Sequence, residues 1–158
     1  TYPLPESQLD RFLLRIAVGY PSREDEMQVL VSRRDGEPVD QLEPIVSCQQ
    51  IVAMQEQVRE VNVDEAMRHY LLDLVEATRN CDQLHVGAST RGALCLYRAA
   101  QALAFVEGRE FVVPDDIKRL AVPVLSHRVI TRGFVHSGNR AVTEQIIDRL
   151  AETVPVPT

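Results

Sequence analysis

The amino-acid sequence predicts a mostly α-helical domain that is preceded by a short helix-strand segment. Two observations carry this prediction: apolar residues recur at the spacing of one helix face through most of the chain, and helix-capping patterns stand before several of these stretches. With 158 residues, of which 45% are hydrophobic, the chain is large enough to bury a core. We therefore expect five to seven short helices with little strand, and no internal repeat.

The N-terminal stretch is expected to hold one helix, one strand and then a second helix. Residues 6–16 show helical spacing, and residues 16–20 predict a short strand. Ser22 is a typical helix N-cap because Asp25, three positions later, lies in the first turn near the positive end of the helix dipole. This second helix should end at Arg33-Arg34.

A loop or linker is expected at residues 35–44, which contain one glycine and two prolines. Ser47 and Gln50 then form a capping-box pattern, which predicts a helix from about residue 48 to residue 60. Asp64 is a second N-cap candidate, for a helix that runs to about Asn80. The apolar face of that helix is predicted to consist of Met67, Leu71, Leu74, Val75 and Thr78.

Residues 88–107 are apolar nearly all round, as in a buried central helix. The polar exceptions Arg91, Arg98 and Gln101 are predicted to share one stripe of that helix. Gly108 supplies a C-terminal stop.

The C-terminal part is expected to hold two further helices. Pro114, followed by two acidic residues, is typical of a helix start. A last helix is predicted over residues 142–152.

The composition excludes several classes of function. The net charge of −6 argues against a dedicated nucleic-acid binder, including a helix-turn-helix protein. Cys48, Cys81 and Cys95 are odd in number and lie among apolar residues, which favours reduced core thiols in a cytoplasmic protein. The cysteines and histidines are not spaced as metal ligands, so no metal site is expected. No apolar run is long enough to span a membrane.

Two patterns superficially resemble nucleotide-binding motifs. Gly87 and Gly92 have the glycine spacing of a phosphate loop, but Ala93 and Leu94 follow where lysine and a hydroxyl residue are required. The only lysine of the chain, Lys118, lies elsewhere, so the chain contains no Walker A loop. The "VNVDEA" stretch resembles a Walker B strand, yet Asp64 is better explained as a helix cap. No nucleophile has a histidine in a hydrolase-type arrangement.

Arg11 and Arg91 each leave two interpretations open. For Arg11, in "LDRF", spacing alone favours a structural ion pair or a solvated face, and the functional alternative is a guanidinium that reaches the nucleotide of a neighbouring subunit. Arg91, in "GASTRG", lies at the expected start of a helix, where free amides and an arginine together attract an anion. Spacing alone does not decide between these interpretations.

The order and surroundings of these arginines resemble one protein family. "TYPLPESQLDRFLLRIAVGYPSREDE" is similar to the segment after sensor 1 in MoxR-type AAA+ ATPases. "VGASTRGALCLYRAAQALAFVEGREFVVPDDIKRLAVPVLSHR" is similar to their sensor 2 helix and lid. The resemblance covers almost the whole chain and weakens after residue 135. It implies an AAA+ lid-type helical bundle after the last helix and strand of the α/β ATPase core.

The resemblance also implies roles for individual residues. Arg11 corresponds to the arginine finger, which acts catalytically across a subunit interface, and Arg91 to the sensor 2 arginine, which binds ATP. Arg98, two turns further on, is a weaker candidate for nucleotide contact. Thr90 stands where the family usually has proline, so the first turn of this helix is expected to be looser.

The resemblance implies a division into four parts. These are the end of the ATPase core (1–21), a connecting helix and loop (22–44), the lid (45–135) and a C-terminal helix and tail (136–158). Walker A, Walker B and sensor 1 are expected in an ATPase core upstream of residue 1, so this chain alone should hydrolyse no ATP and hold no cofactor.

The complete protein is expected to bind ATP and Mg and to hydrolyse ATP, within a ring, commonly a hexamer. A chaperone-like role is implied, with von Willebrand factor A domain proteins as partners. The alternative is a free-standing helical module that binds a protein partner and no nucleotide.

Overall fold

The structure is a computed structural model, and it describes residues 5–33, 38–132 and 140–157. By their contacts the residues divide into two units: a helical unit (Thr1–Arg15 and Glu56–Thr158) and a segment that we call the 16–55 segment (Ile16–Gln55). The helices and strands in chain order are α1 (Glu6–Leu9), α2 (Arg23–Ser32), the 3₁₀ helix η2 (Pro38–Gln41), α3 (Cys48–Glu60), α4 (Glu65–Arg79), β1 (Leu84–Val86), α5 (Thr90–Val106), α6 (Pro114–Leu125), β2 (Ile130–Thr131) and α7 (Arg140–Thr153).

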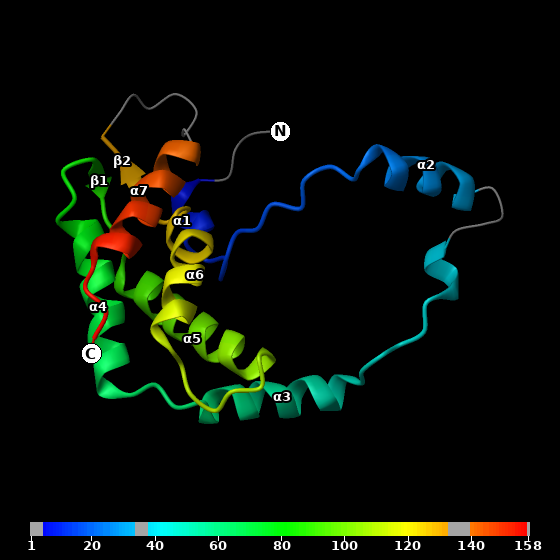
Figure 1. The fold of residues 1–158 in the computed structure, drawn as a ribbon, viewed down its shortest axis with the longest axis horizontal. Coiled ribbons are helices and arrows are strands. Elements are labelled where there is room, and N and C mark those ends of the chain that lie inside the picture. The colour runs from blue at the N-terminus through cyan, green and yellow to red at the C-terminus, as the bar shows by residue number, and fades with distance from the viewer. Residues whose placement is uncertain (1–4, 34–37, 133–139, 158) are drawn as a thin grey trace. The chain divides into compact units, whose positions relative to one another are not determined.

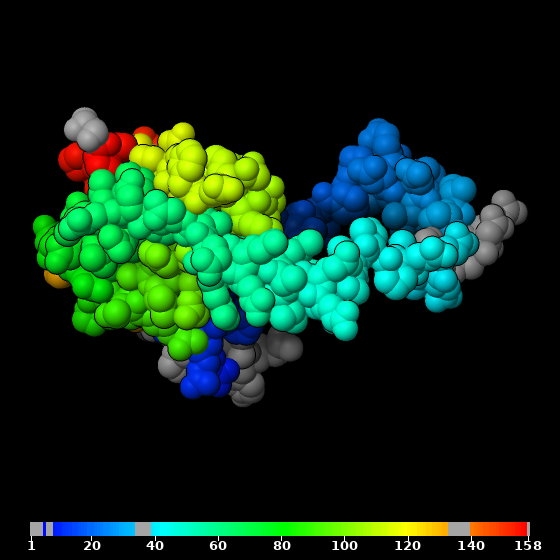
Figure 2. All heavy atoms as spheres, turned by 90° about the horizontal axis from the view of Figure 1, so that it is seen from below, coloured from blue at the N-terminus to red at the C-terminus, as the bar shows by residue number. Residues whose placement is uncertain are grey.

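Four helices build the core of the helical unit. α5 packs against α4 and α6, and α7 packs against α6 and α4 (Figure 1). The space-filling view shows the surfaces of α4 and α5 and the stretch before α6 in continuous contact (Figure 2). Five of the side chains at the centre are almost completely buried: Tyr70, Leu74, Leu96, Ile117 and Ile147. The predicted apolar face of α4 is confirmed, because all five of its members are buried.

The predicted helix caps are formed. Asp64 Oδ1 accepts a hydrogen bond from Met67 N at 2.7 Å, and the Ser47–Gln50 box begins α3. The C-terminal stop of α5 is a Schellman motif, in which Gly108, with φ of 73°, donates to Phe105 O and Arg109 N donates to Ala104 O.

An ion-pair network holds the start of α6 against the end of α5. Asp116 is 1% exposed, accepts both ends of the Arg109 guanidinium at 2.7 and 2.8 Å, and also caps the amide of Val113. Arg109 and Arg119 both bond Glu107, and these hydrogen bonds lower the pKa of the Glu107 carboxyl.

A small antiparallel pair that the sequence patterns did not predict lies beside these helices. β1 pairs with β2, with Leu84 opposite Thr131 and Val86 opposite Ile130. β2 follows the end of α6 by a few residues, so this pairing ties the chain before α5 to the chain after α6.

The predicted strand at residues 16–20 is not formed, and the predicted helix at 6–16 ends at Leu9. A strand needs a ladder partner, and no strand pairs with residues 16–20 among the described parts of the chain. The prediction of a core thiol is wrong for Cys48, which is exposed at the first position of α3. Cys81 and Cys95 are half-buried.

Candidate functional site

The "GAS" stretch places Arg91 by backbone geometry. A side chain at Gly87 would bring a Cβ to 2.6 Å from Arg79 Cα, so only glycine allows this approach to α4. Thr78 Oγ1 accepts the amide of Ala88 at 2.9 Å, and Arg79 Nε donates to Ala88 O at 2.9 Å. The chain therefore enters α5 in a fixed direction.

Ser89 is the N-cap of α5, and its Oγ accepts the amide of Gly92 at 3.2 Å. Thr90 is the first residue of the helix, so the turn forms with threonine in this position. Arg91 follows in the first turn, where unpaired backbone amides give the helix end a positive potential.

The Arg91 side chain is 56% exposed and is held only at one edge. Its Nε donates to the backbone oxygen of Asp10 at 3.2 Å and lies 3.8 Å from the Asp10 carboxylate. Among the described residues its two Nη groups have no hydrogen-bond or ion-pair partner. The guanidinium thus keeps the edge that suits bidentate contact with an oxyanion.

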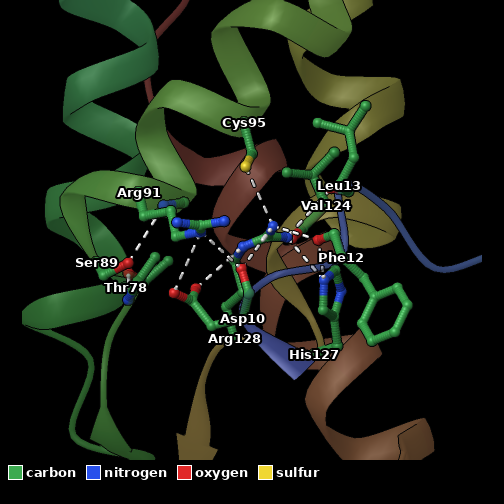
Figure 3. Close-up of polar contacts among 12 residues, drawn as sticks. Asp10, Phe12, Leu13, Thr78, Ser89, Arg91, Cys95, Val124, His127 and Arg128 are labelled. Atoms are coloured by element: carbon green, nitrogen blue, oxygen red, sulfur yellow. Dashed lines mark hydrogen bonds and ion pairs between the residues drawn. The ribbon is translucent and has the colours of Figure 1, made fainter. Parts of the chain in front are cut away.

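Arg128 lies on the other side of Asp10, just after the end of α6, and its side chain is completely buried. Its Nε is 3.3 Å from Asp10 Oδ1. Its Nη groups donate to the carbonyl oxygens of Val124, Asp10, Phe12 and Leu13 and contact Cys95 Sγ (Figure 3). A buried guanidinium is stable only when its charge is paired and its donors are used. The two Nη groups of Arg128 meet this requirement mainly with backbone oxygens, whereas its buried Nε makes no hydrogen bond in the described chain and is compensated only by the Asp10 charge at 3.3 Å.

The carbonyls that Arg128 occupies explain why α1 is short. Asp10, Phe12 and Leu13 direct their oxygens to Arg128 instead of to amides four residues later in a helix. The amide of Arg15 donates to Pro123 O at 2.8 Å, which fixes the segment to α6 a second time. Helical spacing in the sequence did not show this competition.

His127 adds a further contact to the same segment. Its Nε2 lies 3.1 Å from Phe12 O and 2.7 Å from Arg128 Nη1. Burial lowers the pKa of His127, and the positive charges of Arg128 and Arg15 act in the same direction. We call Asp10, Arg91, His127 and Arg128 the Asp10 junction.

Arg11 is separated from this junction although it follows Asp10 directly. Its side chain is exposed, and in the described parts of the chain the guanidinium makes no hydrogen bond or ion pair, although the Arg11 amide donates to Gln8 O. Of the two residues of the "DR" pair, the aspartate is therefore the one whose side chain contacts other residues of the helical unit, Arg91 and Arg128. The arginine projects from the Asp10–Leu13 segment into solvent.

The predicted stripe on α5 is only partly correct. Arg98 is exposed like Arg91. Gln101, however, is 6% exposed and donates from Nε2 to Val61 O at 2.8 Å. At 100° per residue, Gln101 is about 80° away from Arg91 around the helix, which is enough to turn it into the core.

Sequence reasoning missed the contributions of Asp10, His127 and Arg128. Arg128 follows an apolar helix in "VLSHR", and nothing in its spacing indicated a buried guanidinium that binds Asp10, Phe12 and Leu13, 115 to 118 residues away. Within the described ranges no group of three or more His, Cys, Asp or Glu residues could hold a metal ion, and no helix there could cross a membrane.

Comparisons with known proteins agree with the fold. Residues 76–152 match the AAA lid domain family. The chain is 40% identical over 158 residues to YeaC of Bacillus subtilis, covering 99% of this chain and 49% of YeaC. It is 36% identical over 165 residues to "Chaperone MoxR1" of Mycobacterium tuberculosis, covering 99% of this chain and 43% of that protein.

A solved structure shows the same arrangement. The crystal structure of a protein from Cytophaga hutchinsonii, assigned as an ATPase, superimposes with a TM-score of 0.84 at 33% identity, over 99% of this chain and 50% of that one. This chain therefore spans about half the length of the relatives that it matches. From the family match, the relatives and the shared fold, we conclude that the chain belongs to the MoxR-type AAA+ proteins and contains their AAA lid domain.

Proposed function

We propose that this chain is the lid-bearing part of an ATP-hydrolysing MoxR-type protein with a chaperone-like role in the maturation of protein complexes. In this proposal the lid helps to bind ATP and couples hydrolysis to conformational change. The ATPase core that supplies the phosphate loop and the Mg site lies outside this chain. The protein would act as a ring oligomer, a hexamer by family resemblance, and it would be cytoplasmic.

The observation that supports the proposal most is the position of Arg91 and the absence of partners for its Nη groups among the described residues. It lies in the first turn of a 17-residue helix, half-exposed, with its Nε held by Asp10 and its Nη groups without a partner in the described chain. Phosphate oxygens are recognised by this combination of a helix N-terminus and a guanidinium edge. We assign to Arg91 the role of binding the γ-phosphate and reporting its loss.

Arg11 is proposed as the arginine finger that acts on the nucleotide of a neighbouring subunit. Phosphoryl transfer to water depends mainly on neutralising the charge of the transition state, so a guanidinium can supply a large part of the rate without covalent chemistry. An exposed arginine whose guanidinium has no partner in the described part of its own chain is available for that role. Arg98 is proposed as a weaker nucleotide contact.

The partners follow from the same proposal. They are the ATPase core, the neighbouring subunits of the ring and proteins with a von Willebrand factor A domain. The competing function is a helical module that binds a protein partner and no nucleotide. It differs in one measurable respect, because such a module would show no nucleotide dependence in any context.

The decisive experiment is a calorimetric titration with Mg-ATP of two proteins: this 158-residue chain, and a protein that joins it to an ATPase core so that it has the full length of its relatives. We expect binding and turnover only in the longer protein. Tight ATP binding by the short chain would overturn the proposal that the phosphate loop and the Mg site are supplied by an ATPase core outside this chain. No binding by either protein would favour the protein-interaction module.

Two substitutions in the longer protein test the site residues. Arg11→Ala is expected to lower ATP turnover by at least about 100-fold with little change in ATP affinity, because a finger acts on the transition state. Arg91→Ala should weaken both turnover and affinity. Arg68→Ala, at another exposed arginine in α4, is the matched control and should change neither. Wild-type turnover in both variants would remove these assignments.

A further inference from the structure

The strongest unexplained feature of the molecule is how firmly the segment that carries Arg11 is held. Arg128 bonds the carbonyls of Asp10, Phe12 and Leu13, and His127 contacts Phe12 O as well. These contacts join residues that are 115 to 118 apart in the sequence. Every residue of the Asp10–Leu13 segment except Arg11 therefore has an atom bound at the end of α6.

Arg128 and Arg91 share Asp10 but differ in how tightly they are bound. The Arg128 side chain is 0% exposed, donates hydrogen bonds from both Nη groups and holds its Nε 3.3 Å from the Asp10 carboxylate, whereas Arg91 is 56% exposed and donates a hydrogen bond from Nε alone. Because Arg128 alone can neutralise the Asp10 carboxylate, Arg91 can turn to a phosphate without leaving a buried charge unpaired. Arg128 is thus the fixed member of the Asp10 junction, and Arg91 is the movable one.

The direction in which the Arg11 side chain points is set by Arg128. With the carbonyls on both sides of it bound to Arg128, the backbone at Arg11 has one orientation relative to α6, and the Arg11 side chain points to solvent. A movement of α6 would therefore carry Arg11 with it. Catalytic groups need placement to within a fraction of an ångström, so such a link would matter for a finger.

We propose that Arg128 is a positioning residue for Arg11: it clamps the Asp10–Leu13 segment to the lid, so that the position of the lid in one subunit sets the position of the arginine offered to the next. The inference deepens the proposed function and rests on it. Arg128 itself touches no nucleotide in this scheme, and it acts only through the backbone that it binds.

The test uses the full-length protein that contains this chain, with Arg128→Lys as the main variant. Lysine keeps the positive charge for Asp10 but has a single ammonium group, which cannot reach the carbonyls of Val124, Phe12 and Leu13 together. We expect kcat for ATP to fall about 10-fold while the Kd for ATP changes less than about 3-fold. Arg109→Lys is the matched structural control.

Arg109 also forms an ion pair with a buried carboxylate, that of Asp116, but it forms no ion pair with the Asp10–Leu13 segment. Its lysine variant should lower the thermal midpoint and leave kcat unchanged. A loss of kcat in Arg109→Lys equal to that in Arg128→Lys would show a general effect of destabilisation and would overturn the proposal.

A double variant separates positioning from a merely structural role. If Arg128 acts through Arg11, then Arg128→Lys in an Arg11→Ala background should cause no further loss beyond about 2-fold. A full additional 10-fold loss would overturn the inference. If Arg11→Ala alone leaves turnover unchanged, the proposed function fails and the inference falls with it; if only Arg128→Lys is without effect, the inference alone fails.

Hydrogen exchange gives a readout that does not depend on ATP. The amides of Phe12 and Arg15 are bonded to Leu9 O and Pro123 O, so they are protected while the segment is clamped. Arg128→Lys should speed their exchange at least about 10-fold and leave α4 and α7 unchanged. Should that variant not fold, Asp10→Asn, which removes only the carboxylate charge, is expected to show the same pattern more weakly. Unchanged exchange at residues 12 and 15 in the folded variant would overturn the clamp.

Discussion

The helical unit and the 16–55 segment contain similar helices but differ in what covers them. In the helical unit, α4 buries six residues, including Leu74 and Val75, which are 0% exposed. In the 16–55 segment, α2 buries none, and every residue whose side chain is described is exposed. Apolar residues are nevertheless common there, and Tyr20, Leu30 and Ile45 are 98%, 72% and 95% exposed.

The difference shows that local helix signals and packing are separate sources of order. α2 begins with a complete capping box between Ser22 and Asp25, and α4 begins with the Asp64 cap. Caps of this kind contribute about 1 kcal/mol each, whereas most of the stability of a protein helix comes from a buried apolar face. The 16–55 segment has the first kind of support and lacks the second within its own residues.

Truncating a buried leucine and an exposed leucine should give the largest difference in stability between the helical unit and the 16–55 segment. Leu74→Ala is expected to lower the free energy of unfolding by about 3 kcal/mol, because it removes buried apolar surface and leaves a cavity in the core. Leu30→Ala, in α2, should change it by less than about 0.5 kcal/mol. Urea unfolding followed by circular dichroism measures both. Equal losses in the two variants would mean that α2 packs as tightly as α4.

The same distinction explains what the sequence could and could not predict. The starts of α2, α3, α4 and α6 were predicted correctly because each is set by contacts within about four residues, such as the Ser47–Gln50 box. The short α1 was not, because the carbonyls of Phe12 and Leu13 are bound by Arg128, far away in the sequence. A local pattern cannot show a competitor that arrives from 115 residues away.

The residues of the candidate site also fall into those that a local motif predicted and those that only the fold brings together. Arg11 and Arg91 were found because they stand in recognisable motifs, and their proposed roles stay predictions. The strand expected at residues 16–20 was wrong because a short apolar run forms a strand only where a partner strand exists, and none pairs with it among the described residues. Asp10 stands in the "LDRF" motif, but no local pattern links it to Arg128, and only the fold brings the Arg128 Nε to 3.3 Å from the Asp10 carboxylate.

His127 offers a smaller, pH-dependent test of the helical unit. Burial lowers the pKa of His127 in the folded chain, so below the ordinary histidine pKa of about 6.5 the unfolded chain takes up a proton that the folded chain does not. Stability should therefore be complete well above that pH and should fall as the pH drops through it. The slope cannot exceed about 1.4 kcal/mol per pH unit, since one group binds one proton.

The control for this prediction is His69, an exposed histidine of α4 that lies 3.7 Å from Glu65. Urea unfolding of His127→Gln across the same pH range should show a flatter profile, while His69→Gln should keep the wild-type profile. If replacing His69 flattened the profile as much as replacing His127, the burial of His127 would not be the cause.

Two serine caps, one in the helical unit and one in the 16–55 segment, test the same difference with a smaller expected effect. Ser89 accepts the Gly92 amide at the start of α5, and Ser22 accepts the Asp25 amide at the start of α2, both at 3.2 Å. Ser89→Ala should lower the free energy of unfolding of the helical unit by about 1 kcal/mol, because α5 is part of its core. Ser22→Ala removes an equivalent bond and should leave that free energy unchanged, while it lowers the helix content of α2 seen by NMR. Since the two serine caps accept their amides at the same distance, equal losses of global stability would show that the 16–55 segment and the helical unit unfold together.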